Sequence, residues 1–293
     1  MTRPPAARRT GAPASLTPMM TASQSAATTP SRLDGRTASA DAYAWPAECA
    51  GSAGLLLVVI SAIRLTSPGA PLARAAVVPA GRLLVVGAAL GTEVALFGRT
   101  AAGRRSGGDL NPAVTLALWI LGRRPGRDVA PYCAAQLAGG CAGAALARLV
   151  WGGVVASPTI RYGLVQPEKG FSVVLTAVVE AAMAAALVLV IARASDGTIA
   201  AGRVPAVIGT TITVFIWGGG RYSGASFNPT RNFAPAVFSG DWHLQAVYFL
   251  APLLGATGLA IVRRGRGDLR RRRTSERTDR FQPTVGGHEA PTD

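Results

Sequence analysis

Two asparagine–proline pairs are the polar residues whose spacing first suggests chemistry in an otherwise apolar chain. They share the frame Ser-Gly-x-x-x-Asn-Pro, and the two triplets are Asn111, Pro112, Ala113 and Asn228, Pro229, Thr230. Asparagine is a good helix N-cap and proline suits the first helical turn, so each pair predicts a helix start. The side-chain oxygen of a capping asparagine accepts a backbone N–H, which leaves its NH2 group to donate elsewhere.

Other reactive residues are few and scattered. The three cysteines are Cys49, Cys133 and Cys141, and the two histidines are His243 and His288. They lack the paired spacing of a disulfide scaffold or a zinc site, so we expect buried thiols and no metal. No combination of nucleophile, base and orienting group is evident, so the sequence predicts neither an enzyme nor a cofactor.

The composition indicates a membrane protein. Of the 293 residues 49% are apolar and only 15% charged, whereas a soluble domain has roughly 25% charged residues. Six apolar segments approach the roughly 20 residues that span a bilayer. They are 46–63, 80–98, 129–150, 171–192, 204–219 and 243–262. Two shorter stretches, 111–122 and 229–239, open at the Asn-Pro pairs and read as re-entrant half-helices, which implies that they line a pathway. The expected fold is all-α.

Charge divides the chain into three parts. We expect a disordered N-terminal tail at 1–44, a membrane domain at 45–262 and an Arg-rich C-terminal tail at 263–293. The formal net charge is +15, but the basic residues are spread between apolar runs, which argues against nucleic-acid binding. Seven arginines between Arg263 and Arg273 place the C-terminus in the cytoplasm by the positive-inside rule. An even number of spans then places the N-terminus there too, with membrane lipid around the spans.

The membrane domain is a tandem duplication. The two asparagines are 228 − 111 = 117 residues apart, and Glu48 and Glu180 occupy the first span of each half. We place repeat one at about 45–150 and repeat two at about 171–262. Because each half has three spans, the second copy is inverted and the half-helices meet at the midplane. Two helix N-termini, each equivalent to about +0.5 charge, would repel a cation there and orient water, which interrupts proton conduction.

From about Trp45 to Val262 these features resemble the aquaporin family of membrane channels. The resemblance rests on the doubled Asn-Pro motif, the two glutamates, Gln136 and the basic residue Arg231. It implies a passive channel for water and small neutral solutes, a homotetramer and a location in the plasma (inner) membrane. It also implies that Arg231 belongs to the selectivity filter and that Glu48 and Glu180 accept hydrogen bonds from the re-entrant loops.

The other filter positions differ from the water-selective pattern of that family. Counting back from the asparagines places Gly91 where an aromatic residue is usual and Ile216 where histidine is usual, with Ala225 as the third wall. Such small or apolar walls suggest a wide constriction that would admit glycerol, urea or uncharged metalloid acids. Conversely, Ala236 and the pair Tyr248-Phe249 resemble water channels. Asn232 fits neither subgroup.

Two further residues are unusual for the family. Thr230 replaces an alanine, and its hydroxyl either displaces Arg231 slightly or, the interpretation we favour, bonds to its own helix. Glu93 adds a carboxylate to the second span, about 200° around the helix from Gly91. The sequence leaves three alternatives open for Glu93: it faces another subunit, is protonated or lies near the interface.

Three functions are compatible with these features. The first is a channel for water with some small neutral solutes, and the second is a channel mainly for glycerol, urea or metalloid acids. The third is a secondary transporter, because inverted repeats with broken helices also build transporters. A transporter should carry coupling-ion ligands at the midplane, but none of Glu48, Glu93 and Glu180 lies in an Asn-Pro loop.

Overall fold

The computed structural model describes residues 44–74 and 78–280, and side chains as far as residue 269. Within these ranges the regular structure is helical, and six helices are long and apolar enough to cross a membrane. They are α2 (Ala44–Leu65), α3 (Pro79–Phe97), α6 (Gly126–Trp151), α7 (Val173–Ser195), α8 (Val204–Ser223) and α10 (Gln245–Arg280). The expected all-α membrane fold with six spans is confirmed, whereas nearly all of the expected N-terminal tail lies outside the described residues.

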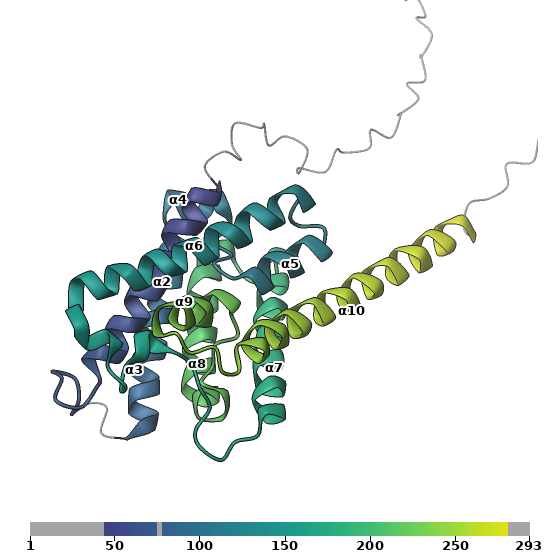
Figure 1. The fold of residues 1–293 in the computed structure, drawn as a ribbon. Helices are drawn as coiled ribbons and strands as arrows, with labels where there is room; N and C mark the ends of the chain where they lie inside the picture. The colour runs from purple at the N-terminus through teal and green to yellow at the C-terminus, as the bar shows by residue number, and fades with distance from the viewer. Residues whose placement is uncertain (1–43, 75–77, 281–293) are drawn as a thin grey trace, which may run out of the picture. The chain divides into compact units, whose positions relative to one another are not determined.

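Two short helices follow the asparagine–proline pairs. They are α5 (Pro112–Ile120) and α9 (Pro229–Ser239), and both lie among the long helices (Figure 1). Smaller pieces that the sequence did not indicate are α4 (Ala101–Ser106), η1 (Gly152–Ala156), η2 (Arg161–Gly163) and η3 (Ala201–Arg203). Leu121 is the C-cap of α5 and Gly240 that of α9, so neither helix reaches the length of a span.

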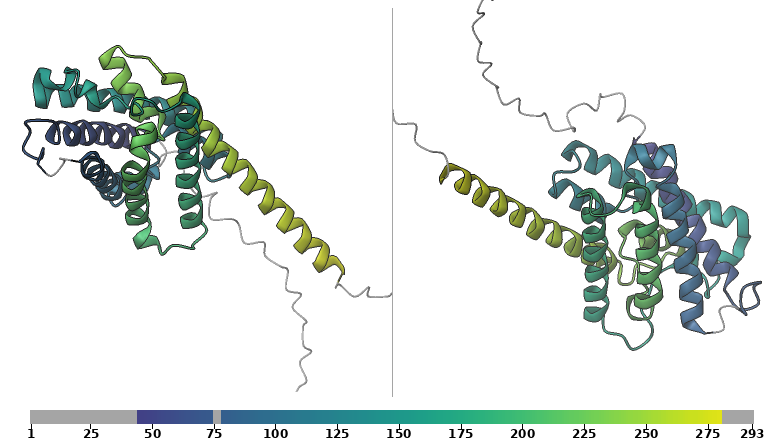
Figure 2. Two further views of the ribbon diagram at one scale, coloured as in Figure 1. Left: turned by 90° about the horizontal axis from the view of Figure 1, so that it is seen from below. Right: turned by 180° about the vertical axis from the view of Figure 1, so that it is seen from behind.

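The long helices pack in equivalent pairs in the two repeats. In repeat one α2 contacts α3 and α6, and in repeat two α7 contacts α8 and α10 (Figure 2). The helices α3 and α8 then join the repeats. Glycines permit these close crossings, since a side chain at Gly143 would collide with the carbonyl oxygen of Ala53, and one at Gly255 with that of Ala181.

The outer surface of the helices carries large apolar side chains. Among them are Leu149, Val174 and Leu254, which are 79%, 73% and 69% exposed. Exposed apolar side chains at this density suit contact with lipid rather than water. The polar residues of the Asn-Pro loops are instead buried at the centre, where Asn111 and Asn228 are both buried.

Candidate functional site

Each asparagine caps the half-helix that follows it. The backbone of Asn111 is extended, and its Oδ1 accepts a hydrogen bond from the backbone N–H of Ala113 at 2.9 Å. The Oδ1 atom of Asn228 accepts from the backbone N–H of Thr230 at 3.0 Å. The cap satisfies one of the N–H groups that a helix start leaves without a partner.

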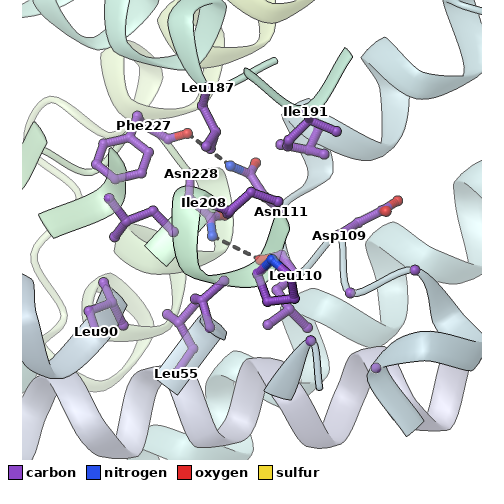
Figure 3. A pocket seen from close by; sticks show the side chains of 18 of the residues that line it. Leu55, Leu90, Asp109, Leu110, Asn111, Leu187, Ile191, Ile208, Phe227 and Asn228 are labelled. Atoms are coloured by element: carbon purple, nitrogen blue, oxygen red, sulfur yellow. Dashed lines mark hydrogen bonds between the residues drawn. The ribbon is translucent and has the colours of Figure 1, made fainter. Parts of the chain in front are cut away.

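The same two side chains also hold the repeats together. The Nδ2 group of Asn111 donates to the carbonyl oxygen of Phe227 at 3.0 Å, and that of Asn228 donates to the carbonyl oxygen of Leu110 at 2.8 Å (Figure 3). We call these two reciprocal bonds the asparagine clasp. One N–H of each NH2 group is used in the clasp. The second N–H of each amide is left to donate.

The clasp depends on strained backbone directly before each asparagine. Leu110 has a φ of 48° and Phe227 a φ of 37°, in the left-handed region that non-glycine residues seldom adopt. Such residues persist only where their surroundings hold them, and here the opposite asparagine binds each carbonyl. The same geometry on both sides is the clearest trace of the duplication.

A buried glutamate anchors each loop from behind. The backbone N–H groups of Asp109 and Leu110 donate to Glu48 at 3.1 and 2.8 Å. Those of Ser226 and Phe227 donate to the two oxygens of Glu180. Both carboxylates are fully buried, so these bonds compensate part of the cost of burying them. Gln136 joins the first anchor by donating to Glu48 Oε2 at 2.8 Å and to Thr115 Oγ1 at 3.0 Å.

The two anchors differ at one position that the sequence analysis did not single out. Asp109 forms a buried ion pair with Arg124 at 2.8 Å and accepts a hydrogen bond from Thr115 at 2.9 Å. Arg124 also lies over the ring of Tyr132, 3.9 Å from its centroid. Ser226 takes the place of Asp109 in repeat two, and its hydroxyl donates to the backbone oxygen of Asn228.

Arg231 lies in the first turn of α9 and is buried. Its Nη1 donates to the carbonyl oxygen of Gly163 at 2.7 Å. The residues Arg161, Tyr162 and Gly163 all have positive φ, which forms the tight turn that carries this carbonyl. Arg231 is held from a loop on one side and by its own helix on the other, so its guanidinium has a fixed position.

Two cavities meet at Arg231. The asparagine cavity, of about 420 Å³, is lined by both clasp asparagines and by apolar side chains that include Leu55, Leu90 and Ile208 (Figure 3). The arginine cavity, of about 450 Å³, is lined by residues that include Val86, Ile216 and Ala225. Arg231 lines both. The arrangement is an apolar path with polar groups at two levels, the arginine and the clasp.

A comparison with known protein families identifies the family of this chain. The sequence profile of the major intrinsic protein family matches residues 38–262, which is most of the chain. The chain belongs to this family.

Individual relatives agree with the assignment. The chain is 31% identical to aquaporin-8 of Mus musculus over 73% of this chain and 78% of that protein. It is 35% identical to aquaporin-8 of Rattus norvegicus over 61% of this chain, and spans 66% of the rat protein. The solved structure of the aquaglyceroporin from Plasmodium falciparum has the same fold, with a TM-score of 0.62, 20% identity, and coverage of 75% of this chain and 94% of that one.

Gly91 does not form a wall of the selectivity filter, which the sequence analysis had predicted. It faces α8, where a side chain would collide with the carbonyl oxygen of Gly209, and it is not among the residues that line the two cavities. Val86 lines the arginine cavity with Ile216 instead. Counting residues back from Asn111 failed because the crossing of α3 and α8 requires glycine at position 91.

The prediction for Thr230 was also wrong. Its side chain is fully buried, and its Oγ1 has no hydrogen-bond partner among the described residues, so it does not bond to its own helix. The methyl group faces α6 at Gly140, where a Cβ would lie 2.7 Å away. Thr230 therefore fills the contact between α9 and α6. Asn232, which fitted neither subgroup, accepts a hydrogen bond from the backbone N–H of Val165 at 2.7 Å.

Proposed function

We propose that this chain is a passive channel that conducts water and small neutral solutes and excludes ions and protons. The observation that carries the proposal is the asparagine clasp at the junction of two half-helix N-termini, in a cavity that Arg231 also lines. Family membership supports it. The names of the relatives, two aquaporins and an aquaglyceroporin, agree with it.

The described geometry explains how a neutral solute could pass and an ion could not. The walls around the clasp are apolar, so an ion entering them would lose hydration without compensation. A water molecule can accept from the remaining N–H of Asn111 or Asn228, and its oxygen is thereby turned toward the asparagines. The paired helix termini add positive potential, which opposes cations and hydronium. Arg231 adds a second positive charge before the clasp.

The walls of the arginine cavity favour a broad solute range. Val86, Ile216 and Ala225, which line this cavity with Arg231, offer no side-chain donor, so a polyol or urea meets an apolar surface as well as the donors of the arginine. We therefore include glycerol, urea or uncharged metalloid acids as permeants. A channel mainly for these solutes is the second candidate, and the same apolar walls are the observation that favours it.

A secondary transporter is the weaker alternative. Among the described residues that line the two cavities the acids are Asp109 and Glu168, and each lies beside an arginine, Arg124 and Arg221 respectively. Glu48 and Glu180 bind backbone N–H groups of the loops. None of these carboxylates is positioned to bind a coupling ion in the path.

We further propose a homotetramer in the plasma membrane with both termini in the cytoplasm. Family membership and the exposed apolar side chains support a multi-pass protein whose helices contact lipid and other subunits. Native mass spectrometry in detergent would give the oligomeric state. Protease protection of a tagged C-terminus in oriented vesicles would test the orientation.

Stopped-flow light scattering on proteoliposomes tests the channel. Vesicles containing the protein should shrink faster than empty ones in an impermeant osmotic gradient, and should re-swell when glycerol, urea or a neutral metalloid acid is the gradient. A planar-bilayer recording should give no ionic current. Water flux equal to that of empty vesicles would overturn the channel, and flux that requires an ion gradient would favour the transporter.

A further inference from the structure

The charged side chains that line the arginine cavity are mostly cationic. Its charged lining residues are Arg82, Arg221, Arg231 and Glu168. Three guanidinium groups and one carboxylate leave a clear positive excess in a confined space. Clefts lined by one sign of charge and bounded by apolar walls attract ions of the opposite sign.

The three arginines differ in how their charge is compensated. The Nε atom of Arg221 lies 3.6 Å from Oε2 of Glu168, so its charge is balanced by a carboxylate. Arg231 donates to a backbone carbonyl, which is a neutral acceptor. Arg82 forms no hydrogen bond and no ion pair with any residue that the structure describes. It is half-buried in the first turn of α3.

Apolar side chains form part of the cavity wall that Arg82 lines. They include Leu83, Val86 and Ile216, which offer its guanidinium no acceptor. A planar guanidinium offers several donors in a fork that matches the oxygens of a carboxylate or a similar oxyanion. Arg82 is therefore a preformed donor without an acceptor.

We propose that the arginine cavity binds a small singly charged oxyanion, a carboxylate or a sulfonate, with Arg82 as its main ligand and Arg231 as the second cation. The cavity volume of about 450 Å³ can hold such an ion with some of its water. The bound anion does not proceed, since the asparagine cavity beyond has largely apolar walls. It occupies the path instead and inhibits the passage of water and neutral solutes.

Binding is tested without any reference to flux. The probe is methanesulfonate, which stays ionised at every pH used, observed by saturation-transfer NMR on the full chain in detergent micelles. Arg82→Gln should weaken its binding by roughly tenfold or more. The matched variant Arg221→Gln, which removes a compensated arginine from the same cavity, should change binding far less.

The inhibitory effect rests on the proposed channel function and is measured separately. Methanesulfonate is added to both sides of proteoliposomes in place of chloride, and osmotic water permeability is expressed relative to the same variant in chloride. The intact chain and Arg221→Gln should be inhibited, whereas Arg82→Gln should not. The neutral isostere methanesulfonamide should give no Arg82-dependent inhibition.

The outcomes separate the two proposals. Binding that is lost in Arg82→Gln, in a chain that conducts no water, would uphold the anion site and overturn the channel. Methanesulfonate that does not bind the intact chain, or binds Arg82→Gln equally well, would overturn the anion site whatever the flux. If Arg82→Gln is still inhibited and Arg221→Gln is not, the anion binds at Arg221 instead of Arg82. That result would also overturn the proposed site.

Discussion

Val86 and Gly91 lie on the same helix but have different tasks. Val86 lines the arginine cavity with Ile216, whereas Gly91 lets α3 approach the backbone of α8 at Gly209. A side chain that enters the cavity from position 86 would change the width of the path. One added at position 91 would push two helices apart.

The variant Val86→Phe should therefore lower glycerol permeability more than water permeability. A ring in the arginine cavity obstructs a solute of larger cross-section, while a single file of water still passes. Stopped-flow measurements on proteoliposomes give both rates, and their glycerol-to-water ratio should fall several-fold. The comparison is Gly91→Phe, which should prevent stable folding. An unchanged ratio in Val86→Phe would show that Val86 is not a filter wall.

The residues of the site were only partly accessible to sequence reasoning. The asparagine–proline spacing indicated both caps, since capping is a local property of the chain. The clasp was not predictable, because it requires Leu110 and Phe227 to adopt left-handed backbone that only the opposite repeat stabilises. Gly91 was misplaced because the register of α3 is set by its crossing with α8, not by distance along the chain.

The buried Glu180 and the half-buried Glu93 should respond differently to the same substitution. Glu180 accepts from the backbone N–H groups of Ser226 and Phe227, so Glu180→Gln should destabilise the protein by about 1–3 kcal/mol by leaving one donor poorly paired. Glu93 has a buried oxygen with no hydrogen-bond partner among the described residues. Glu93→Gln should be neutral or stabilising.

Thermal unfolding in detergent, followed by the loss of helical circular dichroism, compares these two variants. A fall in the midpoint for Glu93→Gln as large as for Glu180→Gln would mean that Glu93 has a partner outside the described part of a single chain, such as a second subunit. Equal tolerance of both substitutions would contradict the role of Glu180 as the anchor of the second loop.

At the scale of elements, α5 is braced at both ends. Its preceding loop is held by the ion pair of Asp109 and Arg124, whose side chains are 2% and 8% exposed. Its last residue, Ile120, accepts a hydrogen bond from Arg264 of α10 at 2.9 Å. A short helix that does not cross the membrane depends on such contacts to keep its position.

Removing one member of the buried pair should cost more than removing both. Asp109→Asn or Arg124→Gln leaves an uncompensated buried charge and should destabilise by about 3–5 kcal/mol. The double variant, which leaves no unpaired charge, should lose less unfolding free energy than either single variant. Unfolding of all four proteins in a denaturant series gives the coupling. Strict additivity of the two single effects would argue that the pair is not coupled.

The turn that carries the acceptor for Arg231 is tied to the end of α9. Asp241 forms an ion pair with Arg161, in the same turn as Gly163, and accepts a hydrogen bond from the backbone N–H of His243 at 2.8 Å. The His243 N–H, followed by the Arg161 guanidinium, holds the pKa of the Asp241 carboxyl below its usual value. The ion pair between Asp241 and Arg161 therefore persists at neutral pH and is lost when the Asp241 carboxyl is protonated in acid.

Because the folded-state pKa is depressed, the stabilisation by Asp241 is fully present above the unfolded-state value of about 3.9. It is lost as the pH falls through the lower folded-state value. The unfolding midpoints of the intact chain and Asp241→Asn should therefore differ by a constant amount from neutral pH down to about 5, and converge below about 4. Because the ion pair is partly exposed to solvent, we expect a small difference. Midpoints that stay equally far apart at low pH would contradict this tie.

At the scale of the whole molecule, the two repeats are alike in their backbone and unlike in their charges. Glu48 and Glu180 bind equivalent loops, and Tyr132 and Tyr248 each donate to the carbonyl oxygen of the serine that opens the motif. The order of spans and half-helices could be predicted, since apolar length and the doubled motif determine it. The charge differences at Asp109 and Arg82 could not be interpreted until the structure placed their partners.

The asparagine clasp makes the two repeats a single cooperative unit, and this can be measured. Asn111→Ala removes a cap, at about 1 kcal/mol, and leaves the carbonyl of Phe227 without its donor, at about 1–3 kcal/mol. Asn228→Ala does the same to Leu110. If the two bonds hold the same junction, breaking one loosens the other, so the double variant should lose about 0.5–3 kcal/mol less than the sum of the single losses.

Equilibrium unfolding of the four proteins in one detergent supplies the cycle, with Asn232→Ala, outside the clasp, as the control partner for Asn111→Ala. Additive losses at Asn111 and Asn228 would mean that the half-helices are held independently by Glu48 and Glu180, and that the clasp only orients the amides toward the passing solute.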